Sequence, residues 1–414
     1  MKESRTFGRN LLQAFLNIWE SPISAAFFAS IFYLCVSAYS QKLSGPSPVD
    51  YFNYLADAFL HGQFNLRLQP PASLDLSVYQ GKTFLNWEPF PAILLMPWVL
   101  LFGVNLNDVL YTALLAGISI GLFAFLLQKA VKQEFLHLSK NQRALLVIFL
   151  CLGTVLVTMA SKGKVWQTAQ IIAFCFTLLV YLAVFTFEGK LAWFLTGLLL
   201  TCATLSRATT LFVGIFPFSL LVLKEKNLGV KKILFHSLIA LFPLVLGFAF
   251  FCYYNWVRFG NILETGMSYH QMADVFVSDY QKFGASNIHY FWRNLYYEYL
   301  FYPLPMRDES TMGGSLFLLS PLFFAIFPAI YKGKPRWGVW ALLISVFLTN
   351  LPIMFHMSTG WVTFGPRYTL DFTVPLLLLT AIGMEEWDNW ISIILALLSI
   401  GQYLIGNYFF LSIF

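Results

Sequence analysis

Long apolar runs recur along almost the whole chain and are separated by polar connections. Eleven of these runs approach or reach the roughly 20 residues that a helix needs to cross a bilayer. The pattern predicts an all-α polytopic membrane protein with about 11 transmembrane helices. The runs lie at 22–39, 109–128, 144–160, 168–187, 191–205, 208–223, 233–252, 315–331, 338–355, 368–384 and 390–411.

Two long polar intervals interrupt this pattern, at 40–108 and 253–314, and a shorter one lies at 356–367. Both long intervals are rich in Tyr, Trp, Asn and Asp, whereas the other connections are short and basic. No linker divides the chain and no internal repeat is visible. We therefore expect residues 1–414 to form a single transmembrane domain.

The interval 40–108 contains two further helical patterns. Residues 49–62 place aromatic and aliphatic side chains on one face of a short helix, and Gly62 is suited to cap its end. An irregular Pro/Asn/Asp passage follows, and then an apolar run that opens at Pro89. The run 92–102 is only about 16 Å long as a helix, well short of the roughly 30 Å hydrocarbon core. We expect a loop that carries two membrane-surface helices and the active site.

The composition agrees with a membrane protein. The chain is 58% hydrophobic and 11% charged, and its mean hydropathy is +0.68, so a soluble protein would have to bury nearly all of it. Residues 1–20 carry Arg5 and Arg9 among apolar positions. We expect them to form an interfacial amphipathic helix, because no short apolar core with a small-residue cleavage site follows. The five cysteines lie in apolar runs without paired or ligand spacing.

The lysines and arginines are concentrated in particular connections between the apolar runs. The formal net charge of +6 therefore does not indicate nucleic-acid binding. If 89–103 stays at the outer surface, three basic clusters fall on the inner side. The positive-inside rule then favours 11 spans, with the amino end cytoplasmic and the carboxyl end and both long intervals outside. The clusters are Lys129, Lys132, Lys140 and Arg143; Lys224, Lys226, Lys231 and Lys232; and Lys332, Lys334 and Arg336.

Several short motifs follow one another in a fixed order along these elements. An acidic residue just after the first span opens a helix that ends in L-x-G, and a Y-x-G-K motif and a P-x-P-A helix come next. In this order the chain resembles the GT-C superfamily of membrane glycosyltransferases, in particular bacterial members related to protein mannosyltransferases and aminoarabinose transferases. The matching passages are DYFNYLAD (50–57), YQGK (79–82), PFPA (89–92), NWVRFG (255–260), ETG (264–266) and FGPRY (364–368).

The resemblance covers spans one to ten and carries several implications. It implies transfer of a sugar from a polyprenyl-phosphate carrier, with an acidic residue of the first loop as base. It also implies a bacterial plasma-membrane protein whose active site faces outside. The acceptor could be a glycan, a lipid or a protein. One position departs from the pattern, because relatives often carry a basic or neutral residue where this chain has Glu88. Contacts to the donor phosphate are therefore expected to differ there.

The reaction itself requires a base, because an acceptor hydroxyl has a pKa far above 7. Asp50 adjoins the first span and is our first catalytic candidate, although it also suits a helix N-cap. Glu88 is the second, since partial burial beside Trp87 would raise its pKa and suit it to catalysis, acceptor binding or metal ligation. It could instead simply interact with the helix dipole. Asp57 is a substrate-binding candidate or a solvated hydrogen-bonding residue.

The departing lipid phosphate requires cations. Arg258 and Arg367 each adjoin the outer end of a span in an aromatic turn, and Arg can grip phosphate with two donors. Arg367 could alternatively pair with Asp371, four residues on. Arg207 breaks the apolar stretch 191–223, a position where a charge usually faces a cavity or a partner. Two weaker substrate-binding candidates are Lys82 and His356.

Two hypotheses follow from the sequence. The first is a membrane glycosyltransferase, and the alternative is a transporter or lipid flippase. A transporter more often shows inverted repeats and midplane charges, whereas the ionisable residues here gather at outer span ends and in outer loops. No His/Cys/Asp cluster has metal-binding spacing, so no cofactor is required, although a divalent cation could assist. The expected partners are the lipid-linked donor, an acceptor and membrane lipids, without nucleic acid.

Overall fold

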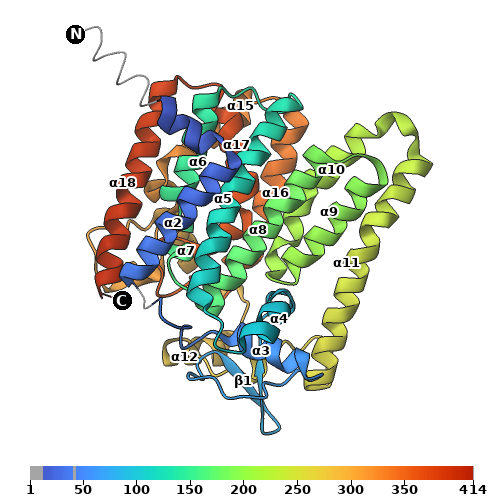
Figure 1. Cartoon of the computed structure of the whole chain (residues 1–414), viewed down its shortest axis with the longest axis vertical. Helices are drawn as coiled ribbons and strands as arrows, with labels where there is room; N and C mark the ends of the chain where they lie inside the picture. The colour runs from blue at the N-terminus through green and yellow to red at the C-terminus, as the bar shows by residue number, and fades with distance from the viewer. Residues whose placement is uncertain (1–12, 41–42, 414) are drawn as a thin grey trace.

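A bundle of long helices forms the body of the protein. The computed structural model describes residues 13–40 and 43–413. Within them, six helices are long and apolar enough to cross a membrane. They run roughly lengthwise through the molecule (Figure 1). The all-α polytopic fold predicted from the apolar runs is therefore confirmed. The six helices are α2 (Pro22–Ser40), α5 (Asp108–Lys132), α8 (Val165–Thr186), α11 (Val230–Phe259), α16 (Arg336–Met354) and α18 (Asn389–Ile413).

The other five predicted spans are also helical, but four of them are broken into shorter pieces. Two of the breaks begin at residues that disrupt a helix: Gly153 ends α6 (Lys140–Leu152) and Pro321 opens η7 (Pro321–Ala325). Only α9 (Gly189–Thr204) is one uninterrupted helix. The remaining pieces are α7 (Leu156–Ala160), η1 (Ala208–Gly214), α10 (Ile215–Lys224), α14 (Leu316–Leu319), α15 (Ile326–Lys332), η8 (Arg367–Phe372) and α17 (Thr373–Met384).

Both long polar intervals gather at one end of the bundle. Helix α3 (Tyr51–Leu60), strand β1 (Leu76–Tyr79) and helix α12 (Asp274–Phe283) lie together at the bottom of Figure 1. Helix α15, next to the third basic cluster, lies at the opposite end, and the last turn of α18 lies on the side of the bundle that faces the loops. This grouping of the loops is the one the basic clusters predict. Which end faces the cytoplasm stays a prediction.

The first of these intervals, named the first outer loop after its predicted side, builds a small layer of its own. Helix α3 packs against α4 (Phe90–Phe102) through buried side chains that include Phe52, Leu55 and Leu95. These are the two short helices expected from the sequence. At 13 residues, α4 is about 20 Å long and too short to span the hydrocarbon core. Strand β1 pairs antiparallel with β2 (Lys82–Leu85) through a tight turn at Gln80-Gly81, where both residues have positive φ.

The interval 253–314, named the second outer loop in the same way, is hydrogen-bonded to the first. The amide of Asp75 donates to the carbonyl of Gln271 over 2.8 Å, and the amide of Gln271 donates to the carbonyl of Leu76 over 2.8 Å. The Ser77 hydroxyl donates to the Gly266 carbonyl, also over 2.8 Å. The second loop continues through η3 (Met267–Tyr269), α12, η4 (Ile288–Tyr290), α13 (Phe291–Leu295), η5 (Tyr296–Leu300) and η6 (Asp308–Met312). The two loops therefore form one cover over the end of the bundle.

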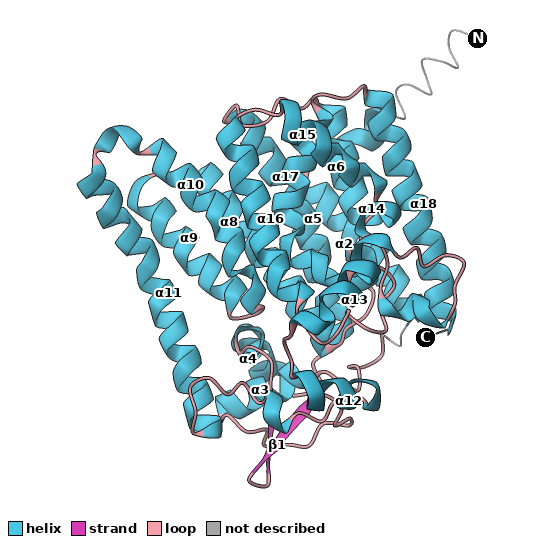
Figure 2. Ribbon diagram, turned by 180° about the vertical axis from the view of Figure 1, so that it is seen from behind, coloured by secondary structure: helices cyan, strands magenta, loops and turns pink. Residues whose placement is uncertain are grey.

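Helices α9, α10 and α11 form a wing beside the bundle (Figure 2). Helix α11 lies on the outside of this wing, and most of its length is exposed because it packs mainly against α9. Such an apolar, exposed helix is suited to contact lipid. The predicted interfacial helix at 1–20 is helical over 13–20, whereas Arg5 and Arg9 lie outside the described residues.

Candidate active site

A cavity of about 470 Å³ lies between the two outer loops and the outer ends of the helices. Its lining comes from the segment before α4, the turn between α7 and α8, the start of η1, the second outer loop and the segment 356–368. Four of the predicted site residues line it. They are Glu88, Arg207, His356 and Arg367.

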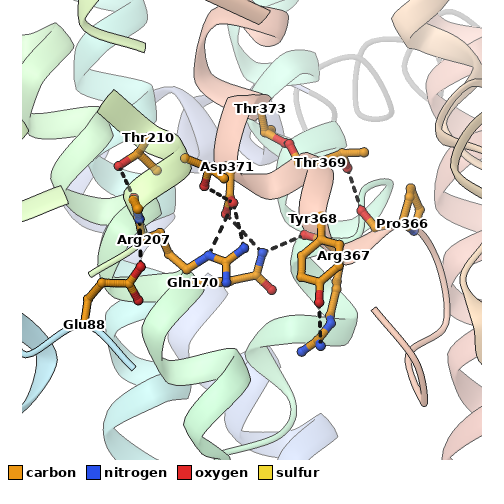
Figure 3. A network of polar contacts seen from close by, with 12 residues as sticks. Glu88, Gln170, Arg207, Thr210, Pro366, Arg367, Tyr368, Thr369, Asp371 and Thr373 are labelled. Atoms are coloured by element: carbon orange, nitrogen blue, oxygen red, sulfur yellow. Dashed lines mark hydrogen bonds and ion pairs between the residues drawn. The ribbon is translucent and has the colours of Figure 1, made fainter. Parts of the chain in front are cut away.

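The partly buried Arg207 and the buried Asp371 form the centre of the polar network in Figure 3. The Nη2 atom of Arg207 lies 2.9 Å from Oδ2 of Asp371, and Thr209 donates to the same oxygen over 2.6 Å. Gln170, on α8, donates to Oδ1 of Asp371 over 3.1 Å and to the carbonyl of Arg367 over 3.0 Å. A charge in these apolar surroundings is stable only when it is paired and hydrogen-bonded. Asp371 is therefore the partner of Arg207, and no ion pair joins it to Arg367.

Arg367 is buried and has few partners. Its guanidinium lies 4.9 Å above the Tyr368 ring, and Nη2 lies 3.3 Å from the Tyr368 hydroxyl. Its Nε atom is buried and makes no hydrogen bond, and no carboxylate among the described residues pairs with it. A buried donor without a partner costs about 1–3 kcal/mol. An anion in the cavity would satisfy it.

Two lysines add to this positive side of the cavity. Lys162 and Lys164 lie in the turn between α7 and α8, and neither forms an ion pair with a described carboxylate. Burial lowers the pKa of Lys162 to about 8, with a further contribution from Lys164, and it also lowers the pKa of Lys164. The turn between them is close-packed, because a Cβ on Gly163 would come within 2.2 Å of the Val109 amide nitrogen. Glycine therefore lets this pair of lysines approach the start of α5.

Glu88 faces the same cavity. Its Oε1 accepts a hydrogen bond of 3.0 Å from the amide of Ala208, next to Arg207. Burial raises the pKa of this carboxyl, and the positive charge of Arg207 opposes that rise. His356 is neutral at pH 7, because burial first, and then Arg207 and Arg367, lower its pKa to about 4. The arrangement combines a carboxylate that can take a proton, Glu88, with cations that can receive an anion.

Asp50 lies outside the cavity lining. It is 3% exposed and accepts a hydrogen bond of 3.0 Å from Asn53, and it makes no side-chain cap to α3. Its Oδ1 is buried without a partner. Burial raises the pKa of Asp50 to about 7, and the nearby charge of Asp108 adds to the rise. The pKa would suit a general base, but Asp50 is not among the residues that line the cavity.

Three other predicted substrate-binding residues also lie outside the lining. Arg67 grips Asp57 with two hydrogen bonds of 2.9 Å. The guanidinium of Arg258 donates to the carbonyl of Leu85 over 2.6 Å and to Asn255 over 2.6 Å. It also stacks on Tyr254 and Phe259. These contacts tie α11 to β2. Lys82 is exposed on the hairpin.

The lining includes charged residues that sequence reasoning did not single out, namely Lys162, Lys164, Asp75 and His270. One signal could have found the lysines. They interrupt an apolar stretch at an outer turn, against the positive-inside rule, as Arg207 does. Asp75 and His270 carry no such signal, because they are 195 positions apart in two polar loops. No three His, Cys, Asp or Glu side chains cluster as a metal site within 13–40 and 43–413.

No family model and no curated protein matches the chain. Among solved structures it is similar to ArnT from Cupriavidus metallidurans bound to undecaprenyl phosphate, with a TM-score of 0.49 and 14% identity over 93% of this chain and 62% of that one. It is also similar to the Archaeoglobus fulgidus oligosaccharyltransferase in the apo form, with a TM-score of 0.47 and 12% identity over 94% of this chain and 55% of that one. Both are GT-C superfamily membrane glycosyltransferases, the superfamily that the motif order resembles.

The chain thus spans less than two thirds of the length of these proteins. A further structure of the Archaeoglobus fulgidus enzyme, AglB in complex with an inhibitory peptide and a dolichol-phosphate, has a TM-score of 0.44. At these scores the similarities carry no conclusion about the reaction or its substrates.

Proposed function

We propose that this chain is an integral-membrane glycosyltransferase that moves a sugar from a polyprenyl-phosphate carrier to an acceptor at the outer face of the membrane. One observation carries the proposal. Three cations without a carboxylate at ion-pair distance line the cavity that also contains the Glu88 carboxylate. Of these, Lys162 and Arg367 are buried and Lys164 is half-buried. This is the charge arrangement that transfer of a sugar from a phosphate requires.

In the proposed step, the acceptor oxygen bonds to C1 of the sugar while the bond from C1 to the phosphate oxygen breaks. The bonding pair goes to the phosphate, which gains negative charge and is stabilised by Lys162, Lys164 and Arg367. The acceptor proton goes to a carboxylate. The Arg207–Asp371 ion pair ties the start of η1 to η8. Gln170 ties α8 to Asp371 and to the Arg367 carbonyl, so these contacts keep Arg367 in place.

The carboxylate that takes the proton is a choice between the two catalytic candidates. Glu88 lines the cavity, whereas Asp50 lies beside Asn53 and Asp108 outside it. A base must reach the proton that it removes, so geometry comes before pKa. We therefore favour Glu88 as the base and keep Asp50 as the alternative that mutagenesis can test.

The position of the cavity suits a lipid-linked donor. Phe251 of α11 contributes to its lining, and α11 is the exposed helix of the wing. A carrier chain in the bilayer could therefore lie beside α11 while its phosphate reaches Arg367. A transporter or flippase remains the alternative, since it would use the same cations to pass a lipid phosphate.

Measuring cleavage of the donor distinguishes a glycosyltransferase from a transporter or flippase. Purified protein in nanodiscs receives a polyprenyl-phosphate sugar with water as the acceptor, and release of free sugar and polyprenyl phosphate is followed by mass spectrometry. A glycosyltransferase releases both slowly, and Arg367→Lys lowers binding of undecaprenyl phosphate because one fork donor is lost. Arg258→Lys is the matched control, since its guanidinium is already engaged away from the cavity. Movement of intact donor between leaflets without any cleavage would contradict the enzyme and support the flippase.

A further inference from the structure

Asp75 and His270, one from each outer loop, meet at the wall of the same cavity. Asp75 directly precedes β1, and His270 directly follows η3. The Nε2 atom of His270 lies 3.0 Å from Oδ1 of Asp75. The indole N–H of Trp166 donates to Oδ2 of Asp75 over 2.9 Å. The indole therefore engages Oδ2 of Asp75, whereas Oδ1 faces the imidazole at contact distance without the geometry of a hydrogen bond.

The imidazole is buried and still has bonding capacity. The His270 side chain is 6% exposed, and neither Nδ1 nor Nε2 has a hydrogen-bond partner among the described residues. A polar atom in this position is normally satisfied by protein, water or a ligand. Because His270 lines the cavity, a ligand hydroxyl there could supply the missing partner.

Aromatic side chains lie beside this pair and along the cavity wall. The Trp87 ring lies 6.4 Å from the His270 ring, edge to face, and Trp166 and Trp361 also line the cavity. A small number of fixed polar groups among aromatic walls is typical of a pocket that orients a small ligand. A pyranose ring fits this chemistry, because its C–H faces are apolar and its hydroxyls lie around the edge.

A peptide fits the same place poorly. An extended peptide would bind most readily by adding a strand to a free edge. Strand β1 pairs with β2 on one side, and on the other side Asp75 and Leu76 already bond to Gln271. No free edge of this hairpin's first strand is therefore left beside the cavity in the described chain. A plain lipid alcohol offers a single hydroxyl and no ring face for the aromatic side chains to contact.

We propose that Asp75, His270, Trp87 and Trp166 form a subsite for the pyranose ring of a carbohydrate acceptor. The proposal rests on the proposed function and names the acceptor class, a glycan, that it leaves open. The ring belongs to the acceptor because these residues lie in or beside the outer loops, whereas the donor phosphate is held by cations at the helix ends. His270 binds a ring hydroxyl, and Asp75 is a positioning residue that acts through His270.

The test uses the full chain in lipid nanodiscs free of glycoside detergent. Saturation-transfer NMR measures binding of methyl α-mannoside, methyl α-glucoside and methyl α-galactoside, and of a neutral Ser/Thr peptide and a short-chain alcohol. Binding of undecaprenyl phosphate is measured separately. The variants are His270→Gln, Asp75→Asn and Trp166→Phe, and the matched controls are His289→Gln and Trp292→Phe, whose side chains lie outside the cavity lining. Thermal unfolding of each variant identifies any that does not fold.

We expect at least one glycoside to bind wild-type protein, and neither the peptide nor the alcohol to bind. His270→Gln should weaken the glycoside about tenfold, the effect of removing one buried hydrogen-bond partner, and leave undecaprenyl phosphate unchanged. Arg367→Gln should weaken binding of undecaprenyl phosphate and leave binding of the glycoside unchanged. Undiminished glycoside binding in folded His270→Gln, or binding of the peptide alone, would overturn the subsite. Displacement of the glycoside by undecaprenyl-phosphoryl mannose would place the ring in the donor and overturn the acceptor assignment. If wild-type protein does not bind undecaprenyl phosphate, that result would instead count against the proposed function.

Discussion

Replacing Asp50 and Glu88 separately by their amides tests the assignment of the base. If Glu88 takes the acceptor proton, Glu88→Gln should lower donor turnover about a hundred- to ten-thousand-fold, the usual contribution of a general base. Gln keeps the size of the side chain and its ability to accept from Ala208. Asp50→Asn should keep most turnover, because Asp50 lies outside the cavity lining.

Asp50→Asn should also change stability in a direction that depends on pH. Burial and Asp108 raise the folded-state pKa of Asp50 to about 7, from an ordinary value of 3.8. Between these two values the folded state binds a proton that the unfolded state has lost, so stability falls as the pH rises. At about 1.4 kcal/mol for each pH unit, the penalty reaches at most about 4 kcal/mol above pH 7. Asn carries no charge, so the substitution removes this penalty. The variant should therefore be more stable than wild type at pH 8 and similar to it at pH 4.

The assay is single-turnover release of polyprenyl phosphate in nanodiscs, with melting temperatures measured from pH 4 to pH 8. The two readouts separate chemistry from folding. Asp50→Asn with turnover reduced a hundredfold and a normal fold, beside an active Glu88→Gln, would make Asp50 the base and refute the geometric argument. A melting temperature for Asp50→Asn that follows wild type at every pH would refute the burial argument.

Three other predictions follow from the structure. Affinity for undecaprenyl phosphate should fall between pH 7 and pH 9, because Lys162, with a pKa near 8, loses its charge there; Lys162→Met should remove that step in a binding titration. Gly163→Ala should weaken undecaprenyl phosphate binding and lower the melting temperature, because the new Cβ would press on the start of α5, whereas the open Gly45→Ala should change neither. In a background without the five native cysteines, Asn141→Cys and Ser73→Cys, both at exposed sites, should label from opposite sides with a membrane-impermeant thiol reagent; labelling of both from outside would contradict the topology.

The apolar pattern was sufficient to predict the architecture. All 11 runs became helical, and α3 and α4 formed where residues 49–62 and the Pro89 block indicated. The reason is physical, because in a bilayer a backbone must satisfy its own hydrogen bonds, so length and hydropathy alone decide which segments are helices. The same logic identified Arg207 and Arg367, since a charge at the end of an apolar run must face a partner or a cavity.

The division of roles among the charged residues came only from the tertiary structure. Asp371 was an equally good partner for Arg367 in sequence, at a spacing of four, yet it pairs with Arg207 from 164 positions away and leaves Arg367 without a carboxylate. Arg258 and Asp50 lie in motifs that suggest site residues. In the structure, however, Arg258 donates to the Leu85 carbonyl and Asp50 accepts from Asn53. Asp75 and His270 become neighbours only when the two outer loops join. Local pattern determines secondary structure because the forces involved act between near residues. Which buried charge finds a partner depends on the packing of distant segments, and that packing decides which side chains remain free to act on a substrate.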